Sequence, residues 1–108
     1  MENIARLVNF PFSKTEEILV KTALLHNKVF AFPTETFYGL GGNAFFKEVA
    51  DRVYNIKERP RNNPLLVLTT PEWLPGLCLW NDSRIDDLMN AFWPGPLTLI
   101  LVANPELP

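Results

Sequence analysis

The sequence predicts an α/β fold, in which helices cover the faces of a twisted open sheet. Helix-like and strand-like patterns alternate along the chain, and the strand-like runs are apolar at nearly every position. A strand that is apolar on both faces needs cover on both faces, and alternating helices supply that cover. With 47% hydrophobic and 20% charged residues, the composition is that of an average globular domain and excludes intrinsic disorder.

The first helix and the first strand lie close to the N-terminus. Ser13 and Glu16 have the spacing of a capping box, and apolar pairs four residues apart predict a helix over residues 14–26. Residues 29–32, Val-Phe-Ala-Phe, predict a short β-strand that ends at Pro33.

The middle of the chain continues the alternation. Residues 39–42 hold three glycines and predict a loop, and apolar residues at helical spacing then predict a helix over residues 47–56. Residues 64–69 predict a second buried strand. Residues 71–74 predict a short helical turn with proline at its start.

The last helix and the last strand have the clearest patterns. Ser83 is the expected N-cap of a helix whose apolar residues recur at i, i+3, i+4 and i+7. The Trp-Pro-Gly-Pro run at residues 93–96 ends this helix. Residues 97–102 then predict a third strand, which is the most apolar segment of the chain.

This third strand bears on domain organisation, because the sequence stops six residues after it. A strand that is apolar on both faces needs neighbours at both edges, and three strands hardly supply them. We therefore expect residues 1–108 to form a single partial domain, with its C-terminal part absent or supplied by another chain. A complete small α/β domain centred on this strand is the alternative.

Charge and rare residues exclude several classes of protein. A net charge of −2 excludes a globally basic coat for nucleic acid. With Cys78 and His26 as the only residues of their kinds, no intrachain disulfide or Cys/His zinc site is possible, and no metal site is expected. Cys78 is expected to be buried and His26 to lie on the surface. There is no membrane span and no secretory signal, which favours a cytoplasmic protein.

Residues 33–44, Pro-Thr-Glu-Thr-Phe-Tyr-Gly-Leu-Gly-Gly-Asn-Ala, form the first chemically suggestive motif. Two hydroxyls, a carboxylate and a phenol follow a strand, which is where α/β sheets usually bind ligands. The glycines would also let backbone N–H groups approach an anion. An ordinary glycine-rich turn is the alternative.

Residues 57–63, Lys-Glu-Arg-Pro-Arg-Asn-Asn, form the second motif, which we call the basic loop. Arginine presents a planar fork to phosphate or carboxylate, and lysine presents a mobile point charge. Such a pair could hold a triphosphate and stabilise charge on a transferring phosphoryl group. A solvated loop without a ligand is the alternative.

Residues 93–98, Trp-Pro-Gly-Pro-Leu-Thr, form the third motif, which by itself indicates only a helix end and a strand start. Trp73, Trp80 and Trp93 are expected in the core. Together, however, the three motifs resemble the YrdC-like family of threonylcarbamoyl-AMP synthases, in the family's order and at about its spacings. The resemblance covers residues 27–102 and implies that family's twisted α/β fold around a large concave cavity.

The resemblance also implies a reaction and the residues that perform it. The family condenses L-threonine, bicarbonate and ATP, expected with Mg²⁺, into threonylcarbamoyl-adenylate and pyrophosphate. By position, Thr36 would contact the substrate threonine and Tyr38 would line the same pocket. Arg59 and Asn63 would bind ATP, and Lys57 with Arg59 would act catalytically on the phosphates. The partners implied are transfer proteins that act on tRNA. Some members of the family bind RNA, so tRNA or double-stranded RNA is a further candidate partner.

Two departures from the family pattern limit what the resemblance implies. Leu68 stands where the family usually has a histidine that helps hold threonine, and leucine cannot form that hydrogen bond. The family's Ser-x-Asn motif, which completes the nucleotide site, does not occur after residues 93–98, so we expect the 108 residues alone to be inactive. A non-catalytic RNA- or nucleotide-binding module and the carbamoyl-transfer domain of a hydrogenase-maturation protein are the alternatives.

Overall fold

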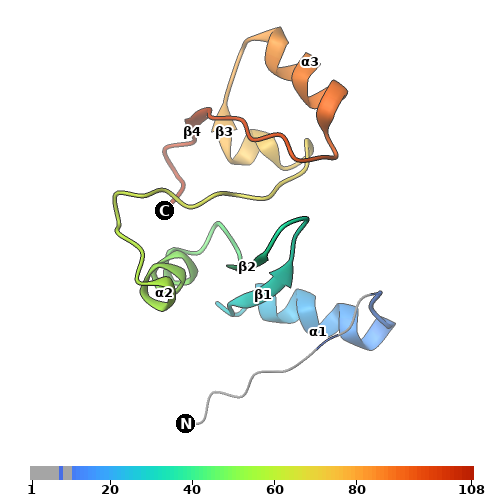
Figure 1. Cartoon of the computed structure of the whole chain (residues 1–108), viewed down its shortest axis with the longest axis vertical. Coiled ribbons are helices and arrows are strands. Elements are labelled where there is room, and N and C mark those ends of the chain that lie inside the picture. The colour runs from blue at the N-terminus through green and yellow to red at the C-terminus, as the bar shows by residue number, and fades with distance from the viewer. Residues whose placement is uncertain (1–7, 9–10) are drawn as a thin grey trace. The chain divides into compact units, whose positions relative to one another are not determined.

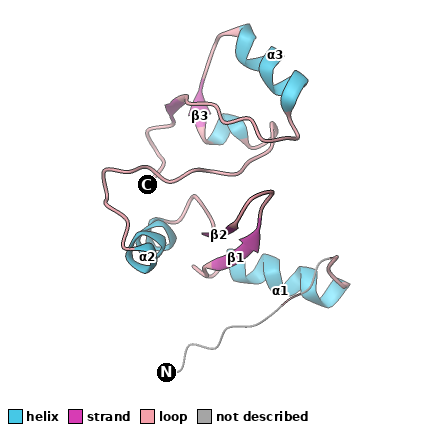
Figure 2. Cartoon of the chain, in the orientation of Figure 1, coloured by secondary structure: helices cyan, strands magenta, loops and turns pink. Residues whose placement is uncertain are grey.

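The computed structural model describes residues 8 and 11–108, which form helices and short strands (Figures 1 and 2). They belong to two compact units, residues 1–63 and 64–108, and each unit is described by itself. The elements are α1 (Lys14–Leu24), β1 (Phe30–Pro33), β2 (Tyr38–Gly41), α2 (Lys47–Lys57), the 3₁₀ helix η1 (Leu74–Gly76), β3 (Cys78–Leu79), α3 (Ser83–Phe92) and β4 (Val102–Ala103). The predicted α/β class is confirmed.

The first unit begins with α1, whose predicted capping box is confirmed. The Ser13 hydroxyl accepts a hydrogen bond from the Glu16 backbone N–H at 3.2 Å, and the Glu16 carboxylate accepts one from the Ser13 N–H at 3.1 Å. The helix ends at Leu24, two residues earlier than expected. Asn27 then adopts a left-handed conformation with φ of 55°, which turns the chain toward β1.

A β-hairpin stands where the sequence predicts a strand followed by a glycine loop. β1 and β2 pair antiparallel, and the register runs from Phe30 opposite Gly41 to Pro33 opposite Tyr38. The predicted loop over residues 39–42 is therefore wrong for its first three positions. The reason lies in the ring of Phe32, which covers Gly39 so closely that a Cβ atom there would lie 2.9 Å from a ring carbon.

Helix α2 packs its apolar side in this unit through Val49 and Val53, which are both buried. Val49 also lies against Gly42, where an added Cβ atom would lie 2.6 Å from the Val49 Cγ1 atom. The helix ends one residue later than predicted, with Glu58 as its left-handed C-cap.

The second unit opens with a correction, because residues 64–69 form no strand. The segment is extended and apolar, but β3 and β4 are the only strands of this unit in the described part of the chain, and they pair with each other. Leu66 and Leu68 are exposed, Leu68 to 67%. A β-ladder requires a neighbour that offers hydrogen bonds, and an apolar sequence cannot replace it.

The core of the second unit consists of Leu74, Cys78 and Met89, against which further apolar side chains pack: Trp80, Ile85, Trp93, Leu99 and Leu101. Cys78 is buried as expected, and burial raises the pKa of its thiol, which keeps it protonated and unreactive. The prediction for Trp73 is wrong, since this side chain is 64% exposed.

Of the predicted strand over residues 97–102, only the last residue lies in a strand of the structure. β4 contains Val102 and Ala103, which pair antiparallel with Leu79 and Cys78, and residues 97–101 carry no strand ladder. Ile100 is 95% exposed. As for residues 64–69, a partner strand is missing among the described residues. β3 has only two residues, and both pair with β4.

Helix α3 has a different N-cap from the one expected. Asp82, not Ser83, is the cap, and its carboxylate accepts a hydrogen bond from the Arg84 backbone N–H at 3.0 Å. Both residue types cap helices well, so the spacing alone did not decide between them. The helix ends at Phe92, before the Trp-Pro-Gly-Pro run, as predicted.

Candidate functional site

The turn between β1 and β2 is organised by the side chain of Thr34. Its hydroxyl accepts hydrogen bonds from the backbone N–H groups of Thr36 at 3.3 Å and Phe37 at 3.1 Å, and it donates to the Phe37 carbonyl. The hydroxyls of Thr34 and Thr36 lie 3.4 Å apart. Tyr38 follows as the first residue of β2 and is 79% exposed. The hairpin thus presents two hydroxyls and a phenol together at one accessible end.

The basic loop folds back on the C-terminal end of α2. The Arg59 backbone N–H donates to the Tyr54 carbonyl at 3.0 Å, and the Arg59 Nε donates to the Asn63 carbonyl at 3.3 Å. The Asn63 N–H donates to the Pro60 carbonyl at 3.0 Å. The structure therefore brings Arg59 and Asn63 together, with Lys57 as the last residue of the helix.

Lys57 lies at a helix C-terminus, where the partial negative charge of the helix dipole favours a cation. The same dipole opposes a bound anion, so a phosphate at this place depends on the basic side chains rather than on helix N–H groups. Three basic side chains, those of Lys57, Arg59 and Arg61, lie within five positions here.

The face of α2 beneath this loop carries residues that the sequence analysis did not select. Arg61 donates to the carboxylate of Asp51 at 2.5 Å and to the side-chain oxygen of Asn55 at 3.2 Å. Its guanidinium carbon lies 4.8 Å from the centre of the Tyr54 ring. The Tyr54 hydroxyl donates to the Asn63 carbonyl at 2.8 Å. The sequence signal for the helix residues among them was their spacing, because Asp51, Tyr54 and Asn55 fall on one side of a helix that leads into the loop.

Hydrogen bonds from Lys47 and from Arg61 hold the pKa of the Asp51 carboxyl below its usual range. Asp51 therefore stays ionised at neutral pH and keeps its two cationic partners. One of them, Arg61, belongs to the basic loop, so the loop is joined to α2 by an ion pair as well as by neutral hydrogen bonds.

The hairpin end and the basic loop keep separate contacts. Within residues 8 and 11–108, no hydrogen bond or ion pair joins Thr36 or Tyr38 to Lys57 or Asn63. Each group can therefore be described as a half-site with its own chemistry. Hydroxyls at the hairpin suit an amino-acid ligand, and cations at the loop suit a polyphosphate.

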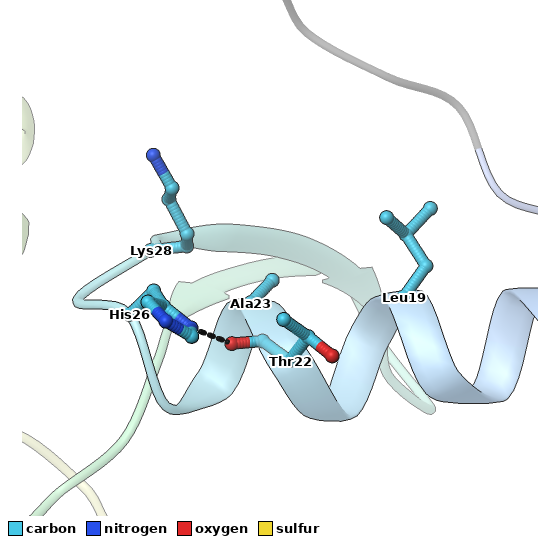
Figure 3. A pocket seen from close by; sticks show the side chains of 5 residues that line it. All are labelled: Leu19, Thr22, Ala23, His26 and Lys28. Atoms are coloured by element: carbon cyan, nitrogen blue, oxygen red, sulfur yellow. Dashed lines mark hydrogen bonds between the residues drawn. The ribbon is translucent and has the colours of Figure 1, made fainter.

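A surface pocket lies elsewhere in the first unit, beside α1 (Figure 3). It is lined by Leu19, Thr22, Ala23, His26 and Lys28. The Nδ1 atom of His26 lies 2.6 Å from the Thr22 carbonyl oxygen, and this exposed ring confirms the expected surface position. None of the predicted site residues lines the pocket.

The described residues contain neither a metal-binding cluster nor a membrane-spanning helix. In that part of the chain, no group of three or more His, Cys, Asp or Glu side chains is arranged to hold a metal ion. Nor does any helix there have the length and apolarity to cross a membrane.

Comparison with known proteins decides the family. A family model for Sua5, YciO and YrdC, described as Telomere recombination, matches residues 22–108. This match includes the hairpin, the basic loop and the Trp-Pro-Gly-Pro run. The chain belongs to the Sua5/YciO/YrdC family. The expected resemblance is thereby confirmed.

Curated relatives in the family bear a consistent name. A threonylcarbamoyl-AMP synthase of Bacillus subtilis is 44% identical over 92 residues, which cover 83% of this chain and 27% of that protein. A threonylcarbamoyl-AMP synthase of Pyrococcus abyssi is 42% identical over 82 residues, which cover 75% of this chain and 24% of that protein. The chain thus spans about a quarter of the length of these two relatives.

A solved structure in the family has the same fold. The crystal structure of P. abyssi Sua5 complexed with L-threonine matches with a TM-score of 0.83 and 34% identity. The match covers 94% of this chain and 30% of the P. abyssi chain. The predicted YrdC-like fold is confirmed by this likeness.

Proposed function

We propose that the protein carrying this chain is a threonylcarbamoyl-AMP synthase, which makes threonylcarbamoyl-adenylate for the modification of an adenosine in tRNA. The observation that carries the proposal is the family match over residues 22–108, because it includes both half-sites. The names of the B. subtilis and P. abyssi relatives support the same activity.

The proposed reaction forms two bonds in sequence. The amine of L-threonine attacks the CO₂ that bicarbonate supplies on losing hydroxide, and the hydroxide takes up the amine proton, so that the products are a carbamate and water. A carbamate oxygen then attacks the α-phosphorus of ATP, and the bond to pyrophosphate breaks with its electron pair going to pyrophosphate. No protein nucleophile is required, so positioning and charge stabilisation account for the catalysis.

In this proposal the two half-sites hold different substrates. Thr36 and Tyr38 at the hairpin contact the threonine, and the threonine complex of P. abyssi Sua5 supports an amino-acid pocket in this fold. Arg59 and Asn63 bind ATP, and Lys57 with Arg59 stabilises the charge that develops on the leaving pyrophosphate. The close pairing of Arg59 with Asn63 supports a shared role in the nucleotide site.

ATP enters this reaction as its Mg²⁺ complex. Since the described residues offer no cluster of three or more metal-binding side chains, we assign the ion to the phosphates of the substrate. Transfer proteins that act on tRNA consume the product, and these partners imply a cytoplasmic location. The two compact units are proposed to form one domain, because the family match runs through residue 63.

The test is pyrophosphate release by the protein that carries this chain, measured with threonine, bicarbonate and ATP. We expect Lys57→Ala to lower kcat by about 100-fold, since removing one group that stabilises transition-state charge typically costs this much. Lys21→Ala is the matched control, because Lys21 is an exposed lysine whose ion pair lies on α1. Its kcat should equal that of the wild type.

Two results would contradict the proposal. One is release of pyrophosphate that does not depend on threonine. The other is a wild-type protein that binds RNA in a salt-dependent manner through Lys57 and Arg59 and releases no pyrophosphate, which would identify a binding module instead.

A further inference from the structure

Tyr54 of α2 forms hydrogen bonds with both Arg59 and Asn63 of the basic loop. Its backbone carbonyl accepts a hydrogen bond from the Arg59 N–H at 3.0 Å, and its hydroxyl donates to the Asn63 carbonyl at 2.8 Å. Arg59 and Asn63 are four residues apart, so one side chain and its own backbone fix both ends of the segment between them. The same Asn63 carbonyl also accepts from the Arg59 Nε at 3.3 Å.

Arg61 holds the middle of the loop on the same helix. Its guanidinium donates to Asp51 at 2.5 Å and to Asn55 at 3.2 Å, and it stacks over the Tyr54 ring at 4.8 Å. A planar guanidinium can make two directed hydrogen bonds and a ring contact at once, which a lysine ammonium cannot do. The contacts of Arg61 are thus directed to α2, whereas Lys57 is exposed at the end of the helix.

The backbone of the loop adopts an unfavourable conformation that these contacts must maintain. Glu58 has a φ of 53°, in the left-handed region, which is less favourable than the right-handed region for a residue with a side chain. Such conformations persist where the surrounding structure fixes them. The contacts of Tyr54 and Arg61 supply that constraint on the C-terminal side of Glu58.

We propose that Tyr54 and Arg61 are positioning residues, which fix Arg59 and Asn63 on α2 in the arrangement that binds the triphosphate of ATP. The inference rests on the proposed function and adds two residues to it. Neither residue needs to touch the nucleotide. Ordering the loop before ATP arrives removes part of the entropic cost of binding, and this advantage is lost when the loop is released.

The test measures ATP binding by calorimetry and steady-state kinetics on the protein that carries this chain. Tyr54→Phe keeps the ring beneath Arg61 and removes only the hydroxyl that holds Asn63. We expect its Kd and KM for ATP to rise by about 2- to 10-fold, the range that one lost hydrogen bond gives. KM for threonine should stay unchanged.

Arg61→Ala should raise Kd for ATP at least as much as Tyr54→Phe, and Arg61→Lys should restore only part of the loss. Arg84→Ala is the matched control, because Arg84 is also an exposed arginine paired with an aspartate, in the second unit. It should leave both constants unchanged. A merely structural role would lower stability and the active fraction without changing KM for ATP.

Calorimetry keeps this inference separate from the proposed function. If the wild type binds ATP but makes no adenylate, the proposed function fails, and the values of Kd still decide the role of Tyr54 and Arg61. Unchanged Kd in Tyr54→Phe and Arg61→Ala, or no ATP binding by the wild type, would overturn the inference.

Discussion

Gly42 shows how a single position ties the hairpin to α2. A Cβ atom there would lie 2.6 Å from the Lys28 carbonyl oxygen and 2.6 Å from the Val49 Cγ1 atom. The first neighbour is backbone and the second is a buried side chain, so neither can move cheaply. We expect Gly42→Ala to lower the free energy of unfolding by about 1–3 kcal/mol, measured by denaturant unfolding.

Gly41 provides the control for this substitution. Its nearest neighbour would be a ring carbon of Phe32 at 3.3 Å, which is the side chain of a half-buried residue. Gly41→Ala should therefore cost less than Gly42→Ala. If Gly41→Ala lowered the free energy of unfolding as much as Gly42→Ala, or more, the close approach of Lys28 and Val49 to Gly42 would not be the cause of the destabilisation.

Asp51 makes stability depend on pH in a defined direction. Hydrogen bonds from Lys47 and Arg61 lower the pKa of its carboxyl in the folded state relative to about 3.9 in the unfolded chain. A lowered pKa contributes stability above the unfolded value, and this stability is lost as the pH falls through the folded value. We expect Asp51→Asn to be less stable than the wild type at pH 7, and the difference to shrink below about pH 4.

Denaturant unfolding across this pH range checks the prediction. Glu17→Gln, which removes an exposed carboxylate paired with Lys21 on α1, serves as the control for a general effect of charge. A difference between wild type and Asp51→Asn that stays constant from pH 7 to pH 3 would contradict the role assigned to the ion pairs.

Individual residues differ in how far the sequence could predict them. Lys57, Arg59 and Asn63 stand out because their types and spacing are those of a family motif, and the structure pairs Arg59 with Asn63. Their roles remain a proposal. Tyr54 and Arg61 were not selected, because helical spacing places Tyr54 on one side of α2 with Asp51 and Asn55 but does not show how the loop folds back on that side.

At the scale of elements, α3 has a different N-cap residue in the structure from the one that the sequence predicts. The Asp82 carboxylate accepts from the Arg84 N–H, whereas Ser83 is the first residue inside the helix. We expect Asp82→Ala to lower the free energy of unfolding by about 1 kcal/mol, the usual cost of a lost N-cap, and Asp82→Asn to lose much less. Ser83→Ala should have little effect.

Thermal or denaturant unfolding of the three variants tests this assignment. The ion pair between Asp82 and Arg84 is exposed and contributes little by itself, so the loss in Asp82→Ala reports mainly on the cap. If Ser83→Ala lowered the free energy of unfolding more than Asp82→Ala, the N-cap would be Ser83, as the sequence pattern predicts.

Helices were predicted better than strands, for a physical reason, and of the three predicted strands only the first, which is β1, was found nearly whole. A helix satisfies its hydrogen bonds internally, so the cap at Ser13 and the apolar spacing in α2 and α3 suffice to locate it. A strand needs a partner. Residues 64–69 and 97–101 have apolar sequences typical of strands, but the described residues offer them no ladder.

At the scale of the whole molecule, the sequence predicted the α/β class and the family, because three motifs in a fixed order are far more specific than any one of them. The family match over residues 22–108 and the TM-score of 0.83 to P. abyssi Sua5 confirm both. The extent of the sheet could not be predicted, since pairing depends on residues far apart in the chain. That residues 1–108 form a single partial domain remains a prediction.

The most direct test of the proposed synthase activity uses carbon-13 bicarbonate with the protein that carries this chain. Mass spectrometry of a reaction with threonine and ATP should detect threonylcarbamoyl-adenylate that contains the label, and omission of any one substrate should abolish it. Lys57→Ala should yield far less of the labelled product. Formation of pyrophosphate without a labelled adenylate, or no product at all, would contradict the proposed function.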